Sequence, residues 1–510
     1  MGEIKDVKSH VGLTSGSLLA RNMVLNILGQ GAPLVAAVFA MPILVKELGL
    51  ERFGVLTLTW TVLGYFSLFD VGLGRALTKL VAEKLGAAQE KEIPALIWTA
   101  LLIMMIMGVI GAILLGLVSS WLISQVLKIP EGLRDETLRS FFLLAIFIPI
   151  VICSIGLRGL LEAHQRFGVI NAARINMGVL TFLGPLLVLQ FSRNLFWVVA
   201  LLGFGRLAEC LFYLVISVRT MPALRRGIRI QREAIVPLFQ YGGWVTVSNI
   251  VGPLMVYSDR FLISVSISMA AVAYYVTPYE IVTKLWFIPS AMAGVLFPAF
   301  SATSNQNPDR TALLFTRGVK VVFLILFPIT LLMTSVAREG LDLWLGREFV
   351  DHSTRVLQWL TMGIFINSMA HIPYALIQAT GRPDLTAKLH VLELPFYLAG
   401  VWWMIGACGI EGAAIAWFAR VSVDTIILLW MAKWLLPKTA HFIRRMAWIL
   451  GAGLLILSFP MFPISILTNR VFLLFMLVTF PFVAWIFILA PEERLYAQEL
   501  LKSKDILSKE

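Results

Sequence analysis

Apolar runs long enough to cross a membrane recur along the whole 510-residue chain, and they limit its fold more than any other feature. A helix of about 18 or more apolar residues spans the hydrocarbon core of a bilayer. A lipid-facing backbone must satisfy its own hydrogen bonds, so repeated runs of this kind predict a bundle of transmembrane helices. Only 14% of the residues are charged, against about 25% in soluble domains. The sequence predicts an all-α polytopic membrane protein without a sizeable soluble domain.

Fourteen candidate spans can be placed along the chain, centred near residues 33, 63, 108, 150, 182, 207, 248, 285, 327, 366, 398, 422, 457 and 480. An even number of spans puts both termini on one side. Of the 42 Lys and Arg residues, 28 fall at the termini and in the even-numbered connections and 11 in the odd-numbered ones. The others, Arg206, Lys284 and Arg420, fall inside spans. Because Lys and Arg concentrate in cytoplasmic loops, we predict cytoplasmic termini. This topology accounts for the net charge of +12, so no nucleic-acid partner is expected.

Several function classes do not fit the sequence. The connections between spans leave no room for a nucleotide-binding domain, and neither G-x-x-x-x-G-K-[ST] nor H-E-x-x-H occurs. The three cysteines, Cys153, Cys210 and Cys408, are far apart in apolar surroundings, which predicts packing thiols and no metal site. The polar N-terminus predicts no cleaved signal peptide.

The two halves of the chain carry matching segments. LLEAHQRFGVINA (160–172) matches LIQATGRPDLTAK (376–388), FGRLAE (204–209) matches FARVSVD (418–424), and Pro33 matches Pro253. Their separations are 216, 214 and 220 residues. Three matches in chain order indicate two repeats of six spans each. An even number of spans gives both repeats the same orientation, as in transporters whose repeats are related by an axis along the membrane normal.

The arginines inside two spans fit this repeat. Arg206 is followed by Glu209, and its repeat partner Arg420 is followed by Asp424. A charge at the centre of a membrane helix is costly, and residues three or four apart share a helix face. We therefore interpret both as structural pairs that neutralise each arginine within its own helix.

The segment MPILVKELGLERFGVLTLTWTVLGYFSLFDVGLGRALTKLVAEKLG (41–86) combines G-x-E-R-F-G, G-Y and F-D-x-G-L-G with a basic helix end. These motifs resemble the Wzx-type polysaccharide and O-antigen flippases of the multidrug/oligosaccharidyl-lipid/polysaccharide (MOP) exporter superfamily. SDRFLIS (258–264), AYYVTPYEIVTKLWFIP (273–289) and LLEAHQRFGVINA extend the likeness over nearly the whole chain.

The resemblance implies a MATE/MOP-like fold, a function and a location. The expected parts are an N-lobe of helices 1–6 (residues 1–225), a C-lobe of helices 7–12 (226–437), and helices 13–14 with a cytoplasmic tail (438–510). A central cavity would be lined mainly by helices 1, 2, 7 and 8. The implied activity is translocation of an undecaprenyl-diphosphate-linked oligosaccharide from the cytoplasmic to the periplasmic leaflet of the bacterial inner membrane by alternating access. It would serve O-antigen, capsule or exopolysaccharide synthesis. Expected partners are that substrate, membrane lipids and polysaccharide polymerase or assembly proteins.

Polar residues at helical spacing mark one face of each implied cavity helix. Asn26 lies on helix 1, Asn249 on helix 7, and Glu280 with Lys284 on helix 8. Such a face avoids lipid. It either lines a cavity or bonds to neighbouring helices within a lobe. For Lys284 we favour a water-filled cavity, because a buried ammonium group is harder to satisfy.

Cations also gather at the predicted cytoplasmic mouth. Arg21 begins helix 1, and Arg75 and Lys79 lie one turn apart at the end of helix 2. A lipid diphosphate needs such donors, and Arg binds phosphate with two parallel bonds. The alternative is that these cations only follow the positive-inside rule. The predicted substrate-binding set is Lys284, Arg21, Arg75, Lys79, Glu280, Asn26 and Asn249.

The second half holds candidates for ion coupling, namely Glu393, His371 and Asp424. Glu393 has no acidic counterpart in the first half, where Met177 stands 216 residues earlier. A membrane carboxylate without a repeat partner is a candidate proton or sodium site. The alternative is a buried network that holds the lobe rigid. No cofactor is expected, and the choice among protons, sodium and membrane potential stays open.

Two other functions compete with the flippase. A multidrug antiporter of the same superfamily would export organic cations, and it would need carboxylates and aromatic rings in its cavity where this chain places cations. A polymerase or ligase of lipid-linked sugars would carry a large periplasmic loop. The longest periplasmic connection here, from about Arg338 to Thr354, is too short for one.

Overall fold

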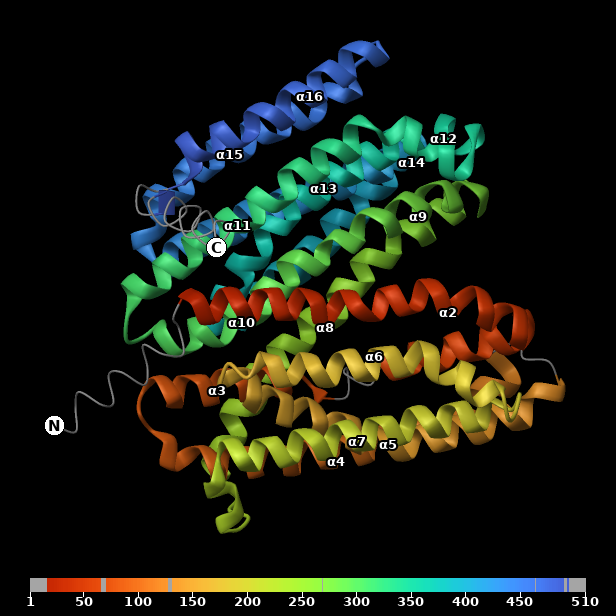
Figure 1. The fold of residues 1–510 in the computed structure, drawn as a ribbon, viewed down its shortest axis with the longest axis vertical. Helices are drawn as coiled ribbons and strands as arrows, with labels where there is room; N and C mark the ends of the chain where they lie inside the picture. Colours follow the sequence, from red (N-terminus) through yellow and green to blue (C-terminus); the bar gives the residue numbers. More distant parts are fainter. Residues whose placement is uncertain are drawn as a thin grey trace, which may run out of the picture. The chain divides into compact units, whose positions relative to one another are not determined.

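The computed structural model describes residues 16–65, 70–126, 131–267, 269–463, 465–489 and 493–494. In this part of the chain every regular element is a helix (Figure 1). Ten helical stretches among these residues are long and apolar enough to cross a membrane. The prediction of an all-α, multi-pass membrane protein is therefore confirmed. The count of fourteen spans and the arrangement of the repeats stay predictions.

Two helical stretches, α2 (Gly16–Tyr65, 50 residues) and α14 (Pro383–Leu435, 53 residues), are long enough for two crossings, since one crossing needs about 20 residues. Gly409 interrupts α14 with φ 62° and ψ −140°. Because a positive φ is easily reached only by glycine, this residue lets the chain turn between two helical halves.

The chain forms two compact units that do not follow chain order. Unit 1 comprises Met1–Leu254, Ser290–Leu314 and Tyr374–Leu392, and unit 2 comprises Met255–Pro289, Phe315–Pro373 and Glu393–Glu510. The predicted division at residues 225 and 437 stays a prediction.

Unit 1 is built around packed pairs of long helices. Helix α5 packs against α4 and α7, and α2 packs along α6 (Figure 1). The helices that lie wholly in this unit are α2 (Gly16–Tyr65), α3 (Leu73–Gly86), α4 (Ile93–Trp121), α5 (Glu131–Ala163), α6 (Phe167–Leu189) and α7 (Leu195–Thr220). Unit 1 also takes the first part of α8 (Ile235–Ser266).

Unit 2 has an aromatic core. Phe323, Phe327, Phe365 and Phe480 form ring pairs with centroids 4.9 to 6.3 Å apart and join three helices. Aromatic pairs at this spacing stabilise beyond their buried area. The helices wholly in this unit are α9 (Met269–Thr283), α12 (Ala337–Leu345), α15 (Ala440–Ser458) and α16 (Ile466–Val483). Helices shared by the two units, besides α8 and α14, are α10 (Phe287–Thr303), α11 (Pro308–Ser335) and α13 (Arg347–Ala379).

The motif F-D-x-G-L-G has a structural explanation within unit 1. The Asp70 carboxylate accepts hydrogen bonds from the backbone N–H groups of Gly72 (2.8 Å) and Gly74 (3.3 Å), and so satisfies donors at the start of α3. Gly72 has φ 68°, and a Cβ there would lie 2.5 Å from the Gly242 carbonyl oxygen. A Cβ on Gly242 would lie 2.6 Å from the Val71 carbonyl oxygen. The backbones of α3 and α8 therefore touch where only glycine fits.

We expect Gly242→Ala to lower the stability of the folded protein by about 1–3 kcal/mol, because the new methyl group must displace backbone. The neighbouring Gly243→Ala is the matched control, since a Cβ there meets nothing within 4 Å. It should be neutral or slightly stabilising because alanine favours the helix. Thermal unfolding of both purified variants in one detergent tests this. Equal melting temperatures would show that α3 and α8 do not approach so closely.

Candidate functional site

A cationic pocket lies within unit 1, with a volume of about 490 Å³. It is formed by the middle of α3, the first part of α8, and the connection into α14 with the first turns of that helix. The charged and aromatic residues that line it, which define the cationic pocket below, are Lys79, Tyr241, Trp244, Arg382, Asp384 and Lys388. Three cations face one carboxylate among these residues, so the pocket carries a net positive charge.

Ion pairs and aromatic rings hold these cations in place. Lys79, whose side chain is 11% exposed, lies 2.7 Å from the Glu83 carboxylate and 5.6 Å from the centre of the Tyr241 ring. Lys388 lies 3.2 Å from Asp384 and 5.3 Å from the centre of the Trp244 ring. Each ammonium group thus has a carboxylate on one side and a ring face on another, which is a favourable cation–π arrangement.

Arg382 completes the pocket. It donates from Nε to Asp384 at 3.0 Å, and this hydrogen bond raises the pKa of the Arg382 guanidinium. Asp384 is therefore shared between Arg382 and Lys388. One carboxylate cannot neutralise two cations, so an anionic ligand would be attracted here.

Only part of the predicted mouth belongs to this pocket. Lys79 lines it. Arg75 lies near it, donating to the side chain of Gln378 at 2.7 Å, and Tyr241 donates to the backbone carbonyl of Gln378 at 2.9 Å. Arg21 is exposed near the start of α2 and is not among the lining residues.

Arg382, Lys388, Tyr241 and Trp244 were not among the predicted site residues. Arg382 lies in the repeat segment 376–388, where it aligns with Arg166 of segment 160–172. The sequence signal that could have found Arg382 and Lys388 is the run of charges in RPDLTAK, next to a predicted cytoplasmic helix end. No such run marks Tyr241 or Trp244.

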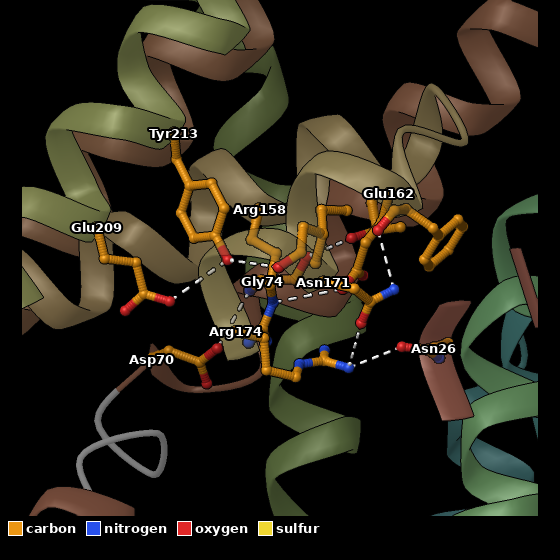
Figure 2. Close-up of polar contacts among 12 residues, drawn as sticks. Asn26, Asp70, Gly74, Arg158, Glu162, Asn171, Arg174, Glu209 and Tyr213 are labelled. Carbon is orange, nitrogen blue, oxygen red and sulfur yellow. Dashed lines mark hydrogen bonds and ion pairs between the residues drawn. The ribbon is translucent and has the colours of Figure 1, made fainter. Parts of the chain in front are cut away.

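Asn26 has a structural role in unit 1 that its polar stripe did not reveal. Its side chain donates to the Ala291 carbonyl at 2.8 Å and accepts from Arg174 at 2.7 Å (Figure 2). Arg174 also donates to Asn171 at 3.3 Å. Asn249, the other predicted amide, is half-buried on α8. The contacts of Asn26 favour hydrogen bonding between helices over a cavity lining.

The expected pair of Arg206 and Glu209 is present on α7, with Nη1 and Oε2 2.9 Å apart. Glu209 also accepts from Tyr213 at 3.3 Å (Figure 2). Two arginines that the sequence count placed in connections, Arg158 and Arg174, lie instead within α5 and α6. Cations therefore lie within more of the predicted spans than the three that the sequence suggested.

In unit 2, Lys284 lies on a 3₁₀ turn (Lys284–Trp286) between α9 and α10. Its side chain is 63% exposed, and Nζ lies 3.2 Å from the Glu280 carboxylate. Glu280 also accepts from Arg260 at 2.9 Å. Arg260, missed at the sequence level although it lies in the quoted SDRFLIS, sits 5.2 Å from the ring centres of both Tyr257 and Tyr279. These residues form a second cluster in which two cations share one carboxylate.

Arg420 lies at the centre of a buried group in unit 2. Its Nη1 lies 3.8 Å from Glu393 Oε2, and its guanidinium lies 5.3 Å from the Tyr397 ring centre. Asp424, its predicted partner, is also buried. The predicted pair of Arg420 and Asp424 did not include Glu393. This carboxylate lies on the same helix, α14, and contacts Arg420. His371 is half-buried, and its ring lies 6.4 Å from that of Trp286.

A further buried carboxylate in unit 2, Asp259, was not predicted. Asp259 is fully buried, and its Oδ2 accepts a hydrogen bond from Tyr275 at 2.6 Å. It lies in SDRFLIS, next to Arg260. A polar pair inside an apolar run was the available signal.

Comparison with known proteins places the chain in a family. A family model described as polysaccharide biosynthesis protein matches residues 19–304. The chain is 32% identical over 417 residues to a Shigella flexneri protein named "Putative O-antigen transporter", covering 81% of this chain and 97% of that one. It is 25% identical over 191 residues to "Probable low-salt glycan biosynthesis flippase Agl15" of Haloferax volcanii, covering 37% and 40% of the two chains.

A solved structure matches the fold. It is the outward-facing conformation of a multidrug resistance MATE family transporter of the MOP superfamily, with a TM-score of 0.72 and 14% identity, covering 84% of this chain and 98% of that one. Identity this low shows the fold alone, whereas the sequence matches show the family. The chain therefore belongs to the polysaccharide biosynthesis protein family, as a Wzx-type flippase of the MOP superfamily with a MATE-like helical fold, and it is a membrane transporter and not an enzyme.

Proposed function

We propose that the protein moves an undecaprenyl-diphosphate-linked oligosaccharide from the cytoplasmic to the periplasmic leaflet by alternating access, for O-antigen, capsule or exopolysaccharide synthesis. The observation that carries this proposal is the cationic pocket. It lies at helix ends that the Lys and Arg distribution assigns to the cytoplasm. Its three cations suit a diphosphate, and its tyrosine and tryptophan are typical of the membrane interface.

Alternating access requires contacts that can open. In unit 1, α3 meets α8 through the Gly72–Gly242 approach, and it meets the end of α13 through the hydrogen bond from Arg75 to Gln378. These contacts join residues of the predicted N-lobe to residues of the predicted C-lobe. We propose that they separate when the headgroup enters from the cytoplasm and re-form after translocation.

The driving force belongs to the proposal as well. Glu393 is 9% exposed, and neither of its carboxylate oxygens accepts a hydrogen bond from the described residues. A buried carboxylate that the described residues hold through one long ion pair, to Arg420 at 3.8 Å, is suited to bind and release a proton or sodium ion. We propose Glu393 as the coupling group, with Asp424 and His371 in the same unit, and the membrane potential as the alternative source of energy. Expected partners are the lipid-linked substrate, lipids and a polymerase.

Deleting the protein from its bacterium tests the function. We expect the lipid-linked oligosaccharide to accumulate on the cytoplasmic side of the inner membrane. There it should be protected from a glycosidase added to the outside of spheroplasts. Expression of the intact chain should remove it. Accumulation of a translocated but unpolymerised glycan would favour a polymerase or ligase. A normal lipid-linked pool with raised retention of organic cations would favour the multidrug antiporter.

A further inference from the structure

Unit 2 contains a cavity of about 360 Å³ that none of the predicted site residues lines. Its walls come from α12, the first turns of α13, and the connection between α15 and α16. The volume lies toward the lower end of the roughly 300–1,000 Å³ that small-molecule sites occupy. In the predicted topology these connections face the periplasm.

Polar groups on this cavity lack partners. Ser335 is 4% exposed, and its hydroxyl makes no hydrogen bond within the described part of the chain. Asn469 donates to the Ser335 carbonyl at 2.7 Å, while its side-chain oxygen has no partner among the described residues. Gln358 is held by hydrogen bonds to the carbonyls of Thr334 (3.1 Å) and Pro460 (3.3 Å). Because buried polar groups are nearly always paired, these groups indicate a ligand with hydroxyl or amide chemistry.

The charges on the cavity are balanced. Arg338 and Arg355 line it together with Glu339 and Asp351. Two cations and two carboxylates give no net charge, so this cavity does not favour a phosphate as the cationic pocket does. The arginines, carboxylates and side-chain amides of the cavity instead supply both hydrogen-bond donors and acceptors for a neutral ligand with many hydroxyl groups.

An apolar wall completes the chemistry. Phe462 lines the cavity with an exposed ring, flanked by Pro460 and Pro463. A sugar has hydroxyl groups at its edge and C–H groups on its face. The edge suits the polar residues, and the C–H face suits a flat aromatic surface with its negative π-face.

We propose that this cavity binds a sugar residue of the exported glycan on the predicted periplasmic side. The identity of that glycan rests on the proposed function, whereas the sugar-binding chemistry rests on the cavity alone. A glycan held here would be kept from returning toward the membrane interior after translocation.

The test uses the purified full chain in detergent with free glucose, galactose, mannose, rhamnose and N-acetylglucosamine as probes. Saturation-transfer-difference NMR should detect binding of at least one of them. Asp351→Asn should weaken its affinity about tenfold, which corresponds to the loss of one charge-assisted hydrogen bond. Asp342→Asn is the matched control, because Asp342 is exposed on α12 and does not line the cavity. It should bind as the unchanged protein does.

Each other outcome overturns the inference. No signal from any of the five sugars contradicts a sugar site, as does equal binding in Asp351→Asn. If no sugar binds while Asp351→Asn abolishes cross-linking to another membrane protein in cells, the cavity is a protein docking site. The proposed function fails separately: sugar binding in a protein whose deletion leaves the lipid-linked pool unchanged would support the cavity and reject the flippase.

Discussion

Replacing Arg382 and Lys388 together by glutamine should reduce glycan export about tenfold or more, while leaving normal amounts of folded protein in the membrane. Both side chains lie on the cationic pocket and are partly exposed, so their loss should not disturb the core. A hydrogen bond to a charged group contributes about 1.5–3 kcal/mol. Allowing for solvent screening, the loss of two leaves at least the 1.4 kcal/mol that corresponds to a tenfold change.

The Asp384→Asn variant distinguishes two interpretations of the cationic pocket, an anion-binding site and a structural ion cluster. If the pocket holds an anion, Asp384 competes with the ligand for Arg382 and Lys388, and its removal should maintain or increase export. If the cluster only stabilises the start of α14, the loss of Asp384 should be as harmful as the loss of its partners. Decreased export in Asp384→Asn would therefore contradict the headgroup site.

A pair of exposed cations elsewhere controls for a general effect of charge. Lys433→Gln with Arg444→Gln removes the same charge at helix ends outside the pocket. Export should be unchanged, and pulse-labelled glycan at the cell surface measures it in all three strains.

The sequence was sufficient for the fold class, an all-α membrane protein, because the apolar runs and short connections leave a membrane helix bundle as the only common solution. The pair of Arg206 and Glu209 could be predicted for a similar reason, since its spacing lies within one helix. Its 2.9 Å contact needs no tertiary information.

The cationic pocket could not be predicted in the same way. Lys79 and Lys388 are more than 300 positions apart, and their common pocket depends on how α3, α8 and α14 pack. The contact between Glu393 and Arg420 was missed for a similar reason. In the sequence the obvious partner of Arg420 is Asp424, which is only four residues away. Tertiary packing decides such partners, and helical periodicity does not report it.

Arg158 and Arg174 show how assigning cations to connections hides those that lie within helices. A cation assigned to a connection is explained by topology alone. The structure places Arg158 in α5 and Arg174 in α6, and Arg174 reaches Asn26 on α2. A boundary error of a few residues is enough to move a cation from a loop to an interhelical contact.

Lys284→Ala should fold normally and lose most glycan export, by about tenfold or more. The side chain is mainly exposed, so its removal should not cost packing. Glu280 remains paired with Arg260 in the variant, so this half-exposed carboxylate keeps a cationic partner. In the proposed function Lys284 contacts the diphosphate during translocation, and the tenfold loss corresponds to about one charge-assisted hydrogen bond.

The energetics of a moving diphosphate explain why a fixed lysine suits this role. One charge crossing 100 mV corresponds to about 2.3 kcal/mol, so two negative charges moving outward would gain about 4.6 kcal/mol. A bound mobile cation would cancel part of that gain by travelling with the substrate. A lysine that stays with the protein lowers the cost of dehydrating the phosphates and leaves the electrical gain intact.

Lys284→Arg should therefore retain part of the export, because it preserves the charge. Lys433→Ala, which removes an exposed lysine at the end of α14, should export normally. Wild-type export by Lys284→Ala at equal protein levels would reject an anionic substrate in this part of unit 2 and strengthen the multidrug alternative.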